Sequence, residues 1–133
     1  MSTDLDHLLK SLHRQRFDVA DNVVTCWFGK KGESRRHSVR LALAAGGIRM
    51  EATVATARTL DAMAVYDDPH RWAWRRNRVS NLVGFRVDGQ RRMLAEAVAP
   101  LIGLTQDEFV TYLMAIAAEA DRMELVLTAQ DVQ

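Results

Sequence analysis

Residues 82–100 read LVGFRVDGQRRMLAEAVAP, in which two apolar runs flank the dipeptide Asp88-Gly89. Asp-Gly is typical of a two-residue β-hairpin turn because both of its positions tolerate positive φ. The pattern therefore predicts antiparallel strands over residues 82–87 and 91–98. Pro100 follows the second strand and is expected to end it, because proline has no N–H to donate to the ladder.

The stretch after this hairpin predicts a long helix. Residues 103–127 read GLTQDEFVTYLMAIAAEADRMELVL, and Thr105 and Glu108 form the T-x-x-E pattern of a helix capping box. Acidic residues in this first turn also suit the positive end of the helix dipole. Apolar residues at helical spacing then continue through about Leu127 and indicate one buried face. They are Phe109, Tyr112, Leu113, Ile116, Ala117, Ala120, Met123 and Leu127.

The beginning of the sequence predicts a short amphipathic helix over residues 4–16, with Thr3 as its N-cap. Its apolar stripe consists of Leu5, Leu8, Leu9 and Leu12. This stripe either packs on the rest of the protein or offers a site to a partner. Residues 17–22 are expected to turn the chain into a strand over residues 23–28, which is rich in β-branched and aromatic residues.

Alternating apolar and polar residues predict a second hairpin. A glycine-rich turn over residues 29–32 precedes it. Residues 37–45 and 48–54 then alternate with the period of two that half-buried strands show. Gly46-Gly47 lies between the two runs and signals a two-residue turn.

The middle of the chain has mixed propensities. Residues 56–68 are interpreted as a connecting segment that is part helix, whereas Asp68-Pro69 predicts the capped start of a helix over residues 69–81. The expected order is α-β-β-β-(α)-β-β-α. The fold class is therefore α+β, with an antiparallel sheet whose apolar face is covered by helices.

Composition predicts one domain over residues 1–133, because 48% hydrophobic and 26% charged residues are ordinary for a globular protein of this length. The N-terminal residues lack the pattern of a signal peptide, and no window approaches a membrane span. We therefore expect a cytoplasmic protein without a membrane contact. Cys26 is the only cysteine, which excludes an internal disulfide, and its apolar neighbours favour a buried thiol over a reactive one.

Charge is segregated along the chain, although the net charge is only +1. Residues 71–92 contain seven arginines (Arg71, Arg75, Arg76, Arg78, Arg86, Arg91 and Arg92) and one acid, Asp88. Residues 107–131 contain six acids (Asp107, Glu108, Glu119, Asp121, Glu124 and Asp131) and one base, Arg122. This distribution predicts a basic face and an acidic face, which would pair within a dimer or attract charged partners.

Motifs for enzyme chemistry are absent from the sequence. The histidines His7, His13, His37 and His70 are scattered, with no H-x-x-x-H or H-E-x-x-H spacing for a metal. There is no G-x-S-x-G elbow, and the glycine-lysine turn at residues 29–32 lacks phosphate-loop spacing. We therefore expect a non-enzymatic protein with no cofactor and no metal.

The tryptophans and arginines of residues 71–92 are the strongest candidates for a binding surface. Trp72 and Trp74 would cover the sheet or a dimer seam, contact a protein partner as interface anchors, or stack on nucleic-acid bases beside arginines. The candidate contact residues are Leu5, Leu9, Leu12, Trp72, Trp74, Arg75 and Arg78.

Several motifs of the second half of the chain form a familiar pattern: WRRNRVSNLV at residues 74–83, FRVDG at 85–89, LAEA at 94–97, Pro100-Leu101, GLT at 103–105 and Ala120-Asp121. In these motifs the chain resembles the YbjN family of bacterial sensory-transduction regulators. That family is similar in fold to the type III secretion chaperones. The resemblance implies an α/β sandwich that forms a homodimer, binds other proteins and takes part in stress responses or regulation. This chain departs from the family in carrying more arginine around the asparagine-containing helix.

Together these patterns predict a chaperone-like or adaptor protein that binds a protein partner. The alternative is a nucleic-acid-binding protein that uses the arginine- and tryptophan-rich surface of residues 71–92. Binding to nucleic acid through arginines would weaken steeply with salt, whereas binding in an apolar groove would not.

Overall fold

The computed structural model describes residues 3–12, 17–28, 35–63, 68–78 and 82–132. The elements in chain order are α1 (Thr3–Ser11), β1 (Phe17–Ala20), β2 (Val23–Phe28), β3 (Arg35–Ala44), β4 (Gly47–Ala55), α2 (Ala57–Met63), α3 (Pro69–Asn77), β5 (Gly84–Val87), β6 (Met93–Pro100) and α4 (Gln106–Val132). The α+β class and the antiparallel sheet predicted from the sequence are confirmed.

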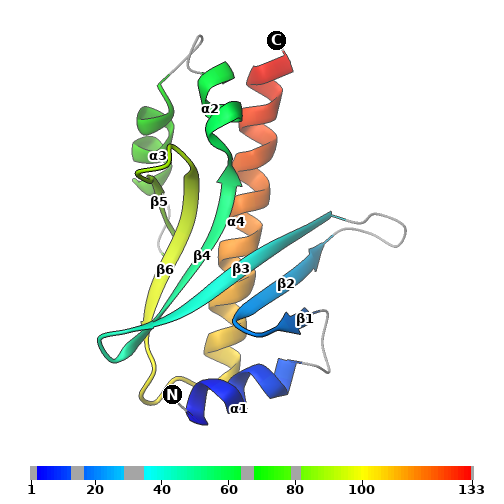
Figure 1. The fold of residues 1–133 in the computed structure, drawn as a ribbon, viewed down its shortest axis with the longest axis vertical. Helices are drawn as coiled ribbons and strands as arrows, with labels where there is room; N and C mark the ends of the chain where they lie inside the picture. The colour runs from blue at the N-terminus through cyan, green and yellow to red at the C-terminus, as the bar shows by residue number, and fades with distance from the viewer. Residues whose placement is uncertain (1–2, 13–16, 29–34, 64–67, 79–81, 133) are drawn as a thin grey trace.

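The strands form one antiparallel sheet in the order β1-β2-β3-β4-β6-β5. The long helix α4 lies along one face of this sheet, and α1 crosses the lower end (Figure 1). No helix of the described residues covers the opposite face, which we call the open face. Pairing between β3 and β4 runs only from Arg40↔Glu51 to Ala44↔Gly47, so the two strands diverge beyond the hairpin end.

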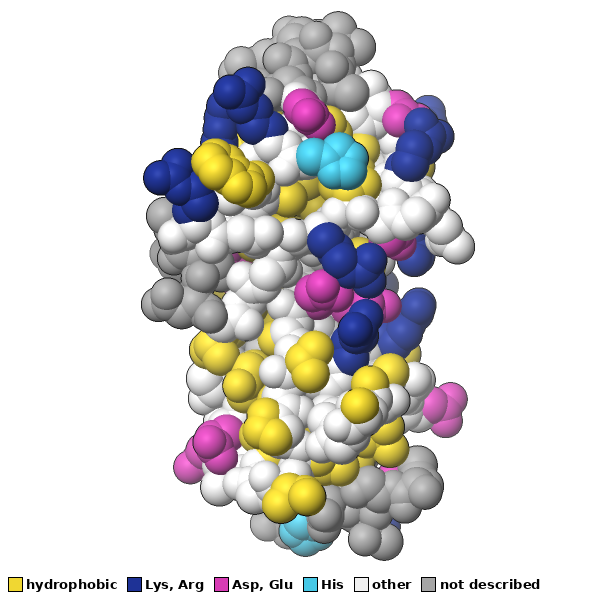
Figure 2. Space-filling model, turned by 90° about the vertical axis from the view of Figure 1, so that its left-hand side faces the viewer, with side chains coloured by type: hydrophobic (Ala, Val, Ile, Leu, Met, Phe, Trp, Pro, Cys, Tyr) yellow, Lys and Arg dark blue, Asp and Glu magenta, His cyan; other side chains and the backbone are white. Residues whose placement is uncertain are grey.

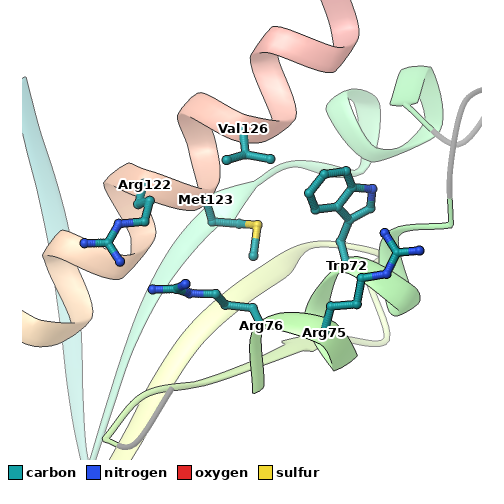
Figure 3. A pocket seen from close by; sticks show the side chains of 6 residues that line it. All are labelled: Trp72, Arg75, Arg76, Arg122, Met123 and Val126. Atoms are coloured by element: carbon teal, nitrogen blue, oxygen red, sulfur yellow. The ribbon is translucent and has the colours of Figure 1, made fainter. Parts of the chain in front are cut away.

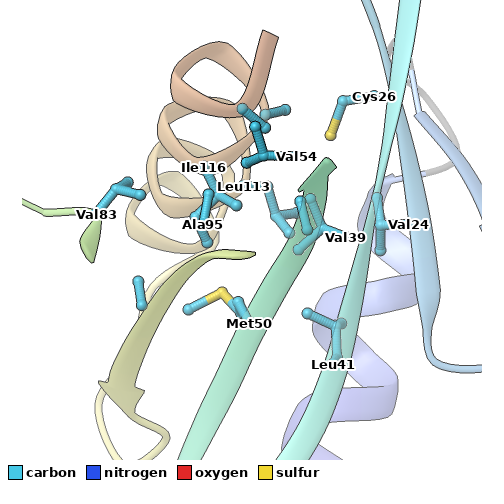
Figure 4. Packing of buried hydrophobic residues seen from close by; sticks show 14 of the residues in the cluster. Val24, Cys26, Val39, Leu41, Met50, Val54, Val83, Ala95, Leu113 and Ile116 are labelled. Atoms are coloured by element: carbon cyan, nitrogen blue, oxygen red, sulfur yellow. The ribbon is translucent and has the colours of Figure 1, made fainter. Parts of the chain in front are cut away.

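The hydrophobic core lies between the sheet and α4 (Figure 4). Alternation along the strands places Val39 and Leu41 of β3, and Met50 of β4, on the inner face, where all three are buried. From α4, Leu113 and Ile116 pack against them. The period of two in the strands and the helical spacing in α4 therefore meet in one apolar layer.

Helix α4 begins with the predicted capping box. The hydroxyl of Thr105 accepts from the N–H of Glu108 at 3.2 Å, and the N–H of Thr105 donates to the Glu108 carboxylate at 3.0 Å. These hydrogen bonds lower the pKa of Glu108, the one from the Thr105 backbone most of all. Except for Tyr112, which is partly buried, the predicted apolar positions of this helix are buried.

Helix α1 docks its leucine stripe on the protein itself. Leu5, Leu8 and Leu12 are buried in the core, and Leu9 is partly buried against it. Of the two roles that the sequence left open, packing on the protein is the one seen in this structure. The predicted helix extended to residue 16, but residues 13–16 lie outside the described part of the chain, as does the predicted turn at residues 29–32.

The prediction that residues 17–22 only turn the chain is wrong. Phe17–Ala20 forms the edge strand β1, paired with β2 from Phe17↔Cys26 to Ala20↔Val23. Only two residues remain for the turn, and Asp21 has a φ of 55° there. The side chain of Asn22 then donates to the carbonyl of Leu41 at 2.9 Å and ties this turn to β3.

The predicted Gly46-Gly47 turn is displaced by one residue. The turn consists of Ala45 and Gly46, which have φ values of 46° and 83°, and Gly47 already belongs to β4. A Cβ atom on Gly47 would lie 2.8 Å from the carbonyl oxygen of Ala99 on β6. Glycine is needed at this position because the backbones of β4 and β6 approach closely. In the sequence, a glycine required for this reason looks the same as a glycine required by a turn.

The Asp88-Gly89 connection is also longer than predicted. Val87 pairs with Met93, so the loop spans residues 88–92, and Arg91 rather than Gly89 has positive φ, at 59°. The Asp88 carboxylate organises the loop by accepting from the N–H groups of Gln90 at 3.0 Å and Arg92 at 2.8 Å. These hydrogen bonds, the Arg92 backbone one foremost, lower the pKa of Asp88.

The segment at residues 56–68 contains α2, a two-turn helix that the sequence marked only as part helix. Helix α3 begins at Pro69 as predicted and ends at Asn77, four residues before the predicted end. With β1 and α2 added, the observed order is α-β-β-β-β-α-α-β-β-α. Within the described ranges, no helix combines the length and apolarity needed to cross a membrane.

Candidate functional site

Helix α3 carries the candidate tryptophans and arginines, and its ends are fixed by specific contacts. Asp68 is the N-cap, and its carboxylate accepts from the N–H of His70 at 3.0 Å. Pro69 at the first position supplies the φ that a helix needs. Arg75 and Arg76 occupy the last turn, where positive charge suits the helix dipole.

Asn77 docks the end of α3 on the edge strand β5. Its side chain donates to the carbonyl of Phe85 at 2.9 Å and accepts from the N–H of the same residue at 2.6 Å. The amide thereby takes the place of a neighbouring strand at this position and blocks part of the free edge. Asn77 is a structural residue that orients α3.

Arg76 connects α3 to α4. Its Nε and Nη2 donate to the two carboxylate oxygens of Glu119 at 2.7 Å and 2.6 Å. This bidentate geometry is the strongest form of an arginine–carboxylate pair. The hydrogen bond to Glu119 raises the pKa of Arg76, so the guanidinium stays charged.

A pocket of about 240 Å³ lies where α3 and α4 meet (Figure 3). The indole of Trp72 extends from α3 toward Val126 of α4, and Met123 lies at the base between the helices. The pocket is lined by Trp72, Arg75, Arg76, Arg122, Met123 and Val126. Its surface is almost wholly apolar, with guanidinium groups around it.

Trp72 and Trp74 lie on different sides of α3, because two residues correspond to about 200° of rotation. Trp72 is partly buried against the core, and Arg75 lies 6.0 Å from its ring centroid. Trp74 is 59% exposed, and the guanidinium of Arg78 lies 5.0 Å from its ring centroid. The helix therefore offers a lined pocket on one side and an open tryptophan–arginine stack on another.

The structure brings some predicted contact residues together and separates others. Trp72 and Arg75 share the pocket, and Trp74 and Arg78 form the stack. Leu5 and Leu9 lie on α1, and Leu12 directly follows it, at the opposite end of the molecule (Figure 1). Leu5 and Leu12 are buried while α1 is docked. A partner contact at these leucines stays a prediction.

Three residues of α4 complete the pocket and were missed by the sequence argument: Arg122, Met123 and Val126. Met123 was predicted only as core. Arg122 had a signal, because it is the one base among six acids in residues 107–131. The sequence does not show which turn of α4 faces α3, so the signal could not be placed.

The predicted separation into a basic and an acidic face is wrong for four of the arginines. Arg76 pairs with Glu119 of the acidic stretch. The other three find acids nearby: Arg86 with Glu96 at 2.9 Å, Arg91 with Asp61 at 2.8 Å, and Arg92 with Asp88 at 2.8 Å. Four of the seven arginines in residues 71–92 are thus paired with acids of the same chain. Figure 2 shows basic and acidic side chains adjacent on one side of the molecule, with hydrophobic groups gathered below them.

Among the described residues, no three histidine, cysteine, aspartate or glutamate side chains are placed to hold a metal ion. Cys26 is buried, and burial raises the pKa of its thiol to about 12. This thiol is therefore a small apolar group of the core and no nucleophile at neutral pH.

Comparison with known proteins identifies the fold. No protein-family model matches the chain and no curated protein matches it, so membership of the YbjN family stays a prediction. One similar solved structure is a chain of the ExsC–ExsE complex, with a TM-score of 0.58 and 17% sequence identity over 96% of each chain. The two chains share a fold. It is the type III secretion chaperone-like α+β fold that the sequence predicted.

Proposed function

We propose that this protein is a non-enzymatic, chaperone-like adaptor that binds a protein partner through α3. The observation that carries the proposal is the pair of tryptophan–arginine contacts on that helix. One of them lines the pocket at Trp72, and the other is exposed at Trp74. Tryptophan and arginine are enriched among the residues that dominate binding energy in protein interfaces.

The fold supports the same proposal. The similar solved structure is a complex of ExsC with ExsE, so a chain of this architecture occurs in an assembly of two proteins. On this chain, the apolar pocket would provide most of the affinity. The arginines around it would steer the approach of the partner and fix its register.

Affinity purification with a matched control tests the proposal. Tagged protein is expressed in its native cell, and recovered proteins are identified by mass spectrometry. Trp74→Ala should reduce recovery of the partner, because it removes an exposed anchor. Trp27→Ala is the control, because Trp27 also lies beneath an arginine, Arg36 at 5.4 Å, but on β2. The proposal fails if no protein is recovered, or if both variants recover the partner equally.

Nucleic-acid binding is the second candidate, and the exposed Trp74–Arg78 stack favours it. Base stacking on an aromatic ring beside arginines is the chemistry of single-strand grooves. Fluorescence anisotropy with labelled single-stranded DNA at low salt tests this function. Binding that weakens steeply with salt and is lost in Trp74→Ala would support it, and no affinity at low salt would eliminate it.

The homodimer is proposed on the open face of the sheet. Val98 of β6 is 58% exposed there, beside Arg49 of β4 and near Glu51 and Glu96. A patch with both charges around an apolar centre is self-complementary under two-fold symmetry. We place such a dimer in a YbjN-like regulator of bacterial stress responses, acting in the cytoplasm.

A further inference from the structure

We infer that the pocket between α3 and α4 binds an acidic anchor motif of the partner, in which one large apolar side chain is flanked by a carboxylate. This inference rests on the proposed function and deepens it, because it specifies the chemistry of the partner. Two properties of the pocket carry it, namely its apolar lining and the exposed guanidinium of Arg122 at its rim.

The size and lining of the pocket suit a single apolar side chain. The ring of Trp72, the Met123 thioether and the methyl groups of Val126 surround the space (Figure 3). Its volume of about 240 Å³ lies below the roughly 300–1,000 Å³ of pockets for drug-sized ligands. One leucine-sized or phenylalanine-sized side chain therefore fits better than a larger cofactor.

The arginines around the pocket favour binding of a carboxylate from the partner. Arg75, Arg76 and Arg122 line it, and the carboxylate of Glu119 contacts Arg76 and Arg122. Both oxygens of Glu119 already accept short hydrogen bonds from Arg76. Arg122 reaches the same carboxylate only at 3.5 Å, and its side chain is 62% exposed. Its guanidinium therefore retains donors for a second carboxylate.

The neighbouring acids of α4, Asp121 and Glu124, are not among the residues that line the pocket. They lie 3.3 Å and 3.5 Å from the imidazole of His37 on β3. At the rim, Arg76 and Arg122 thus share the single carboxylate of Glu119, and Arg76 occupies both of its oxygens. Charge complementarity selects an acidic partner segment over a basic or neutral one.

A nucleic-acid base fits this pocket less well than a side chain does. Stacking needs an open ring face, but Trp72 is packed against the core and Arg75 lies over its ring. The exposed ring available for a base is that of Trp74, on another side of α3. The pocket and the stack can therefore be tested separately.

Selection from a library of short random peptides on the immobilised full chain provides the probe. Selected peptides should share an apolar residue with aspartate or glutamate next to it. The best peptide is then synthesised with a fluorescent label and titrated by anisotropy. Arg122→Glu should weaken its binding by about 30-fold or more, as expected for an interface hot spot.

A second variant and a charge-matched control complete the experiment. Val126→Trp fills the pocket and should also weaken binding, whereas Arg36→Glu makes the same charge change on β3 and should leave the Kd unchanged. Circular dichroism of each variant verifies the fold. The inference would be overturned if the selected peptides lacked acidic residues. It would also be overturned if the Kd were unchanged in both Arg122→Glu and Val126→Trp. The proposed function survives that result if Trp74→Ala still loses the native partner, so the two failures are distinguishable.

Discussion

Gly47 is the position where the hairpin end of β4 leaves no space for a side chain. A Cβ atom there would meet the Ala99 carbonyl at 2.8 Å, and a backbone group cannot rotate away as a flexible side chain can. We expect Gly47→Ala to destabilise the protein by about 1–3 kcal/mol, the usual range for overpacking. Urea denaturation followed by circular dichroism measures the change.

Gly89→Ala is the control for this substitution. Gly89 lies in an exposed loop without positive φ, and a Cβ atom there would have no neighbour within 4 Å. Its stability should match the wild type or rise slightly, because alanine restricts the unfolded chain. Equal destabilisation by both substitutions would contradict the close-approach explanation.

Asp88 should make the 88–92 loop sensitive to acid. The hydrogen bond from the Arg92 backbone holds the pKa of Asp88 below its ordinary value, so the carboxylate stabilises the fold above that ordinary pKa and loses this contribution as the pH falls through the folded pKa. Asp88→Asn should therefore flatten part of the decline in the urea midpoint below about pH 4. Some decline in the urea midpoint remains in the variant, because the pKa of Glu108 is also lowered in the folded protein. An unchanged profile would show that the Asp88 hydrogen bonds do not form in solution.

Cys26 should resist thiol reagents in the native protein. Its pKa of about 12 keeps the thiol protonated far above neutral pH, and its side chain is fully buried. Ellman's reagent at pH 8 should react with it only after urea unfolds the chain. Rapid reaction without denaturant would mean that β2 opens readily.

At the scale of elements, α3 and α4 are held together by the Arg76–Glu119 pair. A double-mutant cycle with Arg76→Ala and Glu119→Ala should give a coupling of about 1–2 kcal/mol, because the pair is bidentate and partly buried. The Arg91–Asp61 pair has a similar distance of 2.8 Å but is mostly exposed. Its cycle should give only about 0.2–1 kcal/mol. Similar couplings for both pairs would contradict the structural role of Arg76.

The sequence predicted elements well where a side chain makes its own local contact. Thr105 and Glu108 cap α4, and Asp68 caps α3, because each hydrogen-bonds within its first turn. Glycine signals were less reliable. Gly47 is required by the close approach of β6, whereas Gly89 does not have a positive φ. The residues beside each glycine show neither fact. Strand β1 was missed because it is defined by its pairing with β2, which residues 17–20 alone do not reveal.

At the scale of the whole molecule, the open face should be the seam between two copies. Val98→Glu would bury a charge in that seam and should convert a dimer to a monomer in multi-angle light scattering. Leu125→Glu is the control, because Leu125 is exposed on α4, away from the open face. A wild-type monomer, or a dimer unaffected by Val98→Glu, would refute this arrangement.

Only the α3 part of the candidate site could be predicted from the sequence, because the site is formed by two segments that are distant in the chain. The tryptophans and arginines of α3 stand out by composition, but Arg122, Met123 and Val126 join them through the packing of α4. The count of charged residues along the sequence also failed to predict which arginines are unpaired in the folded molecule. It treated residues 71–92 as a free basic surface, whereas Arg76 is neutralised by Glu119.

Helix α4 covers the inner face of the sheet, and it follows all the strands in the chain. During synthesis, the ribosome therefore releases every strand before the helix that shields them. The inner residues, such as Leu41 and Met50, stay in contact with water over that interval. Apolar surface that is exposed in this way makes a partly synthesised chain prone to aggregation until α4 has emerged and docked.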